Sequence, residues 1–183
     1  MRRLRLRWLG LLAGICCLWA ALAFLQSGSA WAGFDEGVAA WERSDYAAAL
    51  REFRPLAEQG NAVAQFGLGL MYAHGLGVPQ DHREAVKWYR LAADQGDAGA
   101  QFGLGWMYAE GLGVSQDNRE AAKWYRRAAE QGFAAAQVNL GWMYGNGRGI
   151  PQDFVQAHLW FNLAATQGVD NGKKGRALVG LDR

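Results

Sequence analysis

The sequence repeats itself with a period of 36 residues, and this periodicity constrains the fold more than any other feature. Residues 62–97 and 98–133 are identical at 27 of 36 positions, and residues 134–169 match 98–133 at 18 of 36. Self-similarity at a fixed period of about 20–50 residues is typical of repeat proteins, whose units are each too small to bury an apolar face alone. The sequence therefore predicts an array of stacked units.

The first half of each unit has the pattern of a helix with a glycine in its interior. In the first copy, Ala64, Leu68 and Tyr72 recur at helical spacing. A glycine inside a helix costs about 1 kcal/mol relative to alanine, yet every copy has one, at Gly69, Gly105 and Gly141. We expect these glycines to mark places where a neighbouring element approaches too closely for a side chain.

A glycine loop and a second helix complete the unit. Gly75 suits the left-handed conformation in which many helices end. Asp81 then has the position of an N-cap, and Glu84 follows three residues later, as in a capping box. Trp88 and Tyr89 belong to the apolar stripe of the second helix. We expect the tryptophans at this position, Trp88, Trp124 and Trp160, to lie in the core.

The glycine-rich stretches do not match a phosphate-binding loop. A dinucleotide fingerprint requires G-x-G-x-x-G between a strand and a helix. Here Gly103 and Gly105 fall inside a predicted helix, and Gly111 ends it. The glycines are therefore interpreted as helix contacts and helix stops, and no nucleotide or other cofactor is expected.

The units resemble the Sel1-like repeat family, which is related to tetratricopeptide repeats. The shared pattern is A-Q-x-x-L-G-x-M-Y, then G-x-G-V/I, then Q-D-x-x-x-A-x-x-W-Y/F-x-x-A-A-x-Q-G, and it stands at 64–96, 100–132 and 136–168. The resemblance implies an all-α, right-handed α-solenoid of antiparallel helix pairs that acts as a scaffold for protein–protein contacts. Residues 34–60 look like a plain tetratricopeptide helix pair, and residues 170–183 like a short tail or capping segment.

Residues 1–32 have the pattern of a signal peptide. Four arginines precede an apolar run, residues 8–25, and Ala30-Trp31-Ala32 supplies a small-x-small cleavage site. Cleavage is expected between Ala32 and Gly33, which predicts a periplasmic or secreted protein. An apolar run of 18 residues also leaves open an uncleaved, signal-anchored form.

Loss of this leader would change the charge and the cysteine content. Without its four arginines, fifteen basic residues face seventeen acidic ones, a net charge of about −2. Nucleic-acid binding is not expected, because it depends on basic side chains that neutralise phosphates, and the mature chain would have a net negative charge. Cys16 and Cys17 both lie in the leader, so the mature chain would have to be stabilised by packing alone.

The mature chain offers few groups for enzyme chemistry. Its hydroxyl nucleophiles are Ser44, Ser115 and Thr166, and no serine-hydrolase motif surrounds either serine. The histidines occupy three different repeat positions and form no zinc-binding H-E-x-x-H motif; they are His74, His82 and His158. We therefore expect no enzyme, no catalytic site and no metal site.

Differences between the copies predict where a partner binds. Three positions of the first helix, spaced i, i+3 and i+7, change from copy to copy and share one face, which in the family lines the concave surface. The predicted partner-binding residues on it are Leu70, His74, Trp106, Glu110, Asn139, Trp142 and Asn146. The expected partner is an unidentified protein or peptide, and a glycan such as peptidoglycan is the alternative. A competing interpretation is that both tryptophans pack against a neighbouring first helix.

A second departure lies in the last copy. A row that is largely basic in earlier copies becomes apolar and is preceded by a phenylalanine, giving Phe154, Val155, Leu159 and Leu163. Terminal repeats normally present a polar outer face. We expect the tail to fold over this terminal apolar patch through residues 177–181; the alternative is that a partner or a second copy covers it.

Overall fold

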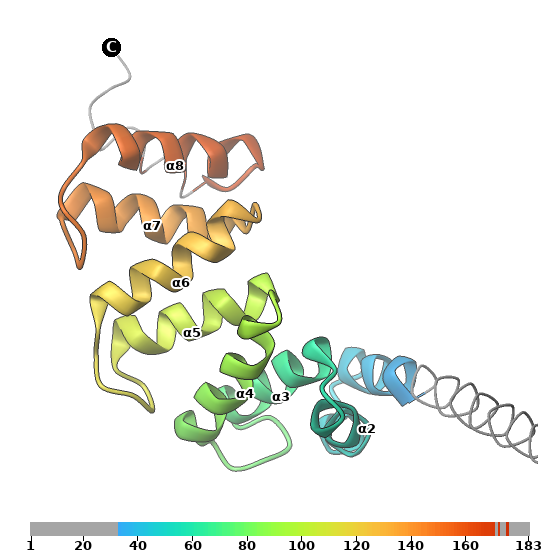
Figure 1. Cartoon of the computed structure of the whole chain (residues 1–183). Helices are drawn as coiled ribbons and strands as arrows, with labels where there is room; N and C mark the ends of the chain where they lie inside the picture. The colour runs from blue at the N-terminus through green and yellow to red at the C-terminus, as the bar shows by residue number, and fades with distance from the viewer. Residues whose placement is uncertain (1–32, 171, 173–174, 176–183) are drawn as a thin grey trace, which may run out of the picture.

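The computed structural model describes residues 33–170, 172 and 175, and every regular element within them is helical. Residues 33–42 are helical, and they are followed by α2 (Tyr46–Glu58), α3 (Ala62–His74), α4 (His82–Asp94), α5 (Ala98–Glu110), α6 (Asn118–Glu130), α7 (Ala134–Asn146) and α8 (Phe154–Thr166). Each labelled helix packs against its neighbours in sequence, and α3 also touches α5. Figure 1 shows the resulting bent stack, with residues 33–42 and α8 at opposite ends. The predicted all-α solenoid is confirmed.

The loops between paired helices form as the glycine pattern predicts, with one difference. Gly75 ends α3 in the left-handed conformation, with φ of 70°, and the carboxylate of Asp81 accepts the amides of Arg83 and Glu84 at 2.8 and 3.1 Å. The second bond of a capping box, from the Asp81 amide to the Glu84 side chain, does not form. The amide of Asp81 donates instead to Tyr72 O at 2.9 Å, because it closes the loop back onto α3. The Glu84 carboxylate therefore pairs with Lys87.

One aromatic ring of each second helix packs against at least one bare stretch of helix backbone. A Cβ built on Gly69 would lie 2.4 Å from Tyr89 Cδ1, and one on Gly103 would lie 3.1 Å from the same ring. A Cβ built on Gly105 would lie 2.7 Å from the Tyr125 ring, and one on Gly141 would lie 2.8 Å from the Phe161 ring. The expectation that these helix glycines permit close packing is thus confirmed.

The tryptophans beside these rings are less buried than the sequence suggests. Trp88, Trp124 and Trp160 are half-buried, whereas the next residue in each helix, Tyr89, Tyr125 or Phe161, is buried. Residues that follow each other in a helix point about 100° apart. The tyrosine or phenylalanine ring enters the space between two first helices. The tryptophan before it therefore points toward the core of the preceding helix pair and packs against that core.

A ladder of buried glutamines joins each helix pair to the one before it. Gln101 Nε2 donates to Ala93 O at 3.2 Å, and its Oε1 accepts from Gln131 Nε2 at 2.8 Å. Gln65 and Gln137 make the equivalent bonds. Each of these glutamines lies on a first helix and joins two second helices, the one before it in the sequence and the one after it.

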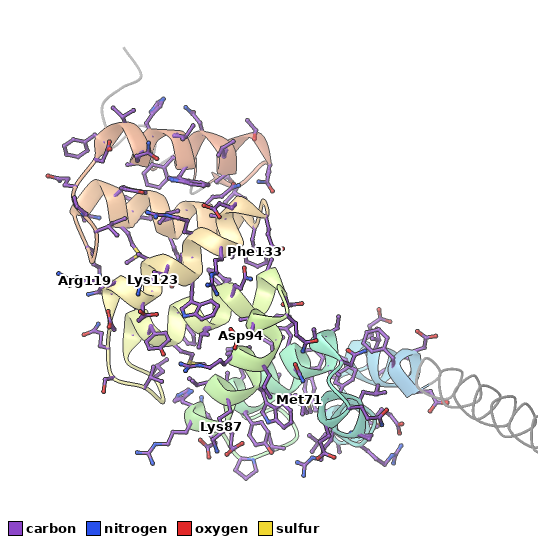
Figure 2. All side chains as sticks on the ribbon, in the orientation of Figure 1. Met71, Lys87, Asp94, Arg119, Lys123 and Phe133 are labelled. Atoms are coloured by element: carbon purple, nitrogen blue, oxygen red, sulfur yellow. The ribbon has the colours of Figure 1, made fainter. Side chains whose placement is uncertain are left out.

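The charged side chains that the structure describes lie on the outside of this stack. Figure 2 shows Lys87 extending away from the ribbon while Met71 lies among the helices.

The buried tyrosine rings predict a loss of stability at alkaline pH. Burial raises the pKa of Tyr125 to about 12 and that of Tyr89 further above its ordinary value of 10.0. The folded state therefore holds both protons more tightly than the unfolded state. The stabilisation is complete below about pH 10, the unfolded pKa, and is lost as the pH rises toward the folded value.

Urea denaturation between pH 8 and 11 tests this prediction. We expect the free energy of unfolding to fall above pH 10, and to fall less steeply in the double variant Tyr89→Phe, Tyr125→Phe. Phenylalanine should fit, since Phe53 and Phe161 occupy the equivalent positions. An equal slope in both proteins would show that other groups cause the alkaline loss.

Candidate functional site: a groove along the first helices

Three adjoining hollows run along the first helices of successive pairs. Their volumes are about 190, 360 and 430 Å³. The first and second share Phe66 and Leu70 as lining residues, and the second and third share Phe102 and Trp106. Because each hollow shares lining residues with the next, they lie in one row along the first helices. We call this row the first-helix groove.

The groove contains all seven residues predicted to bind a partner. Leu70 and His74 line its second hollow, and Trp106 lines the second and third. The third hollow adds Glu110, Asn139, Trp142 and Asn146. The structure places these side chains along one row of hollows, and their role in binding stays a prediction.

The two tryptophans combine both roles that the sequence leaves open. Trp106 is half-buried and packs against the cores of two successive pairs. Trp142 packs edge-on against Phe161, with ring centroids 5.3 Å apart, and keeps 39% of its surface exposed. Each indole therefore rests on the repeat core and also lines the groove.

Several groove residues were not singled out from the sequence. Phe102 stacks near Tyr125 and Phe133, with centroids 5.7 and 5.1 Å apart, and it lies one helical turn before Trp106. Phe133 stands where earlier copies have an aspartate or asparagine N-cap, and it makes no side-chain cap. The replacement of a capping residue by an aromatic one is the sequence feature that could have identified Phe133 as a groove residue.

The third hollow also contains charged and hydrogen-bonding groups. Arg148 donates to Asn118 Oδ1 at 2.9 Å and to Ala109 O at 3.0 Å. The Tyr125 hydroxyl is hydrogen-bonded to Asn139, which lowers the pKa of that tyrosine against the larger effect of burial. Glu110 is exposed and has no hydrogen bond or ion pair with any residue that the structure describes.

The described residues include no cluster of three or more His, Cys, Asp or Glu side chains able to hold a metal ion. The three histidines are thus part of no such group. Within the same residues, no helix is both long enough and apolar enough to span a bilayer.

The terminal apolar patch is exposed, with exposed fractions from 39% for Leu163 to 70% for Val155. The described beginning of the tail lies elsewhere. A Cβ on Gly175 would fall 2.5 Å from the Phe161 ring, and at about 100° per residue Phe161 is on the opposite side of α8 from Leu159 and Leu163. Residues 177–181, which we expected to cover the patch, lie outside the described residues.

Comparison with known proteins agrees with the fold. The Sel1 repeat profile matches residues 62–97, 98–133 and 134–169. No curated protein matches the sequence significantly. A Sel1 repeat protein from Oxalobacter formigenes is 36% identical over 78% of this chain, with a TM-score of 0.74. A protective antigen of uropathogenic Escherichia coli, described as having an SLR fold, is 42% identical over 80%, with a TM-score of 0.75.

The matched region is only part of these two proteins, because it spans 58% of the first and 32% of the second. Cysteine-rich protein B of Helicobacter pylori shares the fold, with a TM-score of 0.57 and 19% identity over 71% of this chain and 93% of its own. Sel1 repeat proteins generally mediate protein–protein interactions and are typically non-enzymatic scaffolds. With three consecutive matches that cover more than half of its length, the chain belongs to the Sel1 repeat family.

Proposed function

We propose that this protein is an exported scaffold of the bacterial cell envelope, and that its first-helix groove binds an extended segment of another protein. The observation that carries the proposal is the row of three hollows, which share lining residues along successive helix pairs. A long groove suits an extended chain better than a compact ligand. Export rests on the leader pattern of residues 1–32.

The lining of the groove favours a protein segment over a glycan. The first two hollows are lined mainly by apolar side chains, among them Phe34, Leu70 and Phe133. Sugar hydroxyls buried there would lack hydrogen-bond partners, which costs free energy. Apolar side chains of a protein would instead gain from leaving water.

A double variant tests the role of the groove. We expect Trp106→Ala, Trp142→Ala to lose most binding, because partly exposed tryptophans in a groove are typical hot spots worth about 2 kcal/mol or more each. A tagged full-length protein would be crosslinked in cells and purified from the envelope fraction, and its partners quantified. The intact mass of the same sample reports whether the chain begins at Gly33.

Trp124→Ala is the matched control, since Trp124 is half-buried but lies outside the groove. It should keep the crosslinked partners. If the double variant unfolds at a much lower temperature than this control, the two tryptophans serve the core and the proposal fails. Binding of the purified protein to peptidoglycan sacculi, abolished by the double variant, would replace the protein partner by a glycan.

A further inference from the structure

The third hollow differs from the rest of the groove in its charge. The described residues that line the first two hollows include no Asp, Glu, Lys or Arg. The third hollow contains Glu110 and Arg148. The part of a bound segment that lies there must therefore have a different chemistry from the part that lies over Leu70.

Only one of these two charged groups has hydrogen-bond partners among the described residues. The guanidinium of Arg148 is held by Asn118 Oδ1 and Ala109 O. The Glu110 carboxylate has no partner among the described residues. At the Tyr125 hydroxyl, which belongs to the wall of the hollow, Glu110 raises the pKa more than Arg148 lowers it. Glu110 therefore contributes a negative field at the wall of the hollow.

The ends of two helices add to this field. Glu110 is the last residue of α5, and Asn146 is the last residue of α7. Both residues line the third hollow. Because the C-terminal end of a helix has a partial negative charge, two such ends beside one carboxylate favour a cation.

The aromatic walls suit a particular cation. Trp106 lies one helical turn before Glu110, and Trp142 holds the equivalent position in the next pair. Indole faces attract cations, and a planar guanidinium can also stack on them. The chain contains this interaction already, since the guanidinium of Arg127 lies 4.6 Å from the ring centroid of Trp124.

We propose that the third hollow is a subsite for a basic side chain, preferably arginine, of the bound segment, with Glu110 as its counter-ion and Trp106 and Trp142 beside it. The inference rests on the proposed function, because the ligand is taken to be an extended protein segment. Apolar side chains of that segment fill the first two hollows, and the basic residue follows at the far end.

Selection from a phage-displayed library of random dodecapeptides tests the subsite. The immobilised chain from residue 33 is compared with Glu110→Gln, which removes the charge but keeps the shape. Glu130→Gln is the matched control, because Glu130 is the exposed last residue of α6 and lies outside the groove. We expect Arg and Lys to be enriched at least about threefold with the parent chain and with Glu130→Gln. With Glu110→Gln their frequency should return to that of the library, while apolar enrichment persists.

A synthetic consensus peptide extends the test to single residues. Replacing its arginine by glutamine should weaken binding to the parent chain by about tenfold, but should have little effect on binding to Glu110→Gln, as expected for two groups that interact directly. Basic enrichment that is absent, or that survives in Glu110→Gln, overturns the subsite. Peptides whose binding is unaffected by Trp106→Ala, Trp142→Ala instead overturn the proposed groove function.

Discussion

Replacing Tyr125 by alanine is expected to lower the free energy of unfolding by about 3–5 kcal/mol, the usual cost of truncating a buried aromatic ring. Only 3% of Tyr125 is exposed, and a Cβ on Gly105 would lie 2.7 Å from its ring. Because one wall of the site is helix backbone with no side chain, little can move in to fill the cavity. Urea denaturation followed by far-ultraviolet circular dichroism measures the change.

Tyr125→Phe is the control for the ring itself. It keeps the packing and loses the hydroxyl that is bonded to Asn139, so we expect a loss of about 1 kcal/mol. A loss of less than 1 kcal/mol in Tyr125→Ala would mean that the array closes around the missing ring. The ring would then not be the main contact between α6 and the neighbouring first helices.

Gly113→Ala is expected to cost about 2–5 kcal/mol, the sum of a conformational and a packing cost. Gly113 has a φ of +71°, and a Cβ there would lie 2.3 Å from His82 O, which is backbone and cannot turn aside. The left-handed conformation adds about 1–2 kcal/mol for a residue with a side chain, and forced overpacking typically adds about 1–3 kcal/mol. The shift in the urea midpoint gives the measured value.

Gly132→Ala separates these two effects. Gly132 also has a positive φ, of +86°, but nothing lies within 4 Å of its added Cβ. It should show the conformational cost alone. Equal losses in the two variants would mean that the loop moves away from the start of α4 at no cost, and that its close approach to α4 does not stabilise the array.

The repeat pattern predicted the features that depend on one helix or one loop. Gly69 and Gly75 could be interpreted from helix propensity and left-handed conformation alone, and both interpretations are confirmed. The Glu84 half of the capping box was predicted wrongly, because the bond from the Asp81 amide to Tyr72 O depends on how the loop closes. No local propensity contains that information.

Features that join two repeats were harder to predict. The recurring glutamine at position 101 was visible in the sequence, but its partner Gln131 lies 30 residues away. Trp88 packs against the core but is less buried than Tyr89, because the neighbouring helices decide which of two adjacent rings is enclosed. In the groove, Phe102 and Arg148 were missed for the same reason. Phe102 contacts Phe133 of the next unit, and Arg148 is bonded to Asn118 and Ala109 of the preceding helix pair.

The mainly sequential packing of the helices has a kinetic consequence. The glutamine bonds join residues 8 and 30 positions apart, and chain of that length is synthesised within a few seconds, at about 5–20 residues per second. Topologies dominated by such short-range pairings fold quickly. Each helix pair can therefore dock on its predecessor as soon as it emerges, from the ribosome or from a translocation channel, without waiting for the rest of the polypeptide.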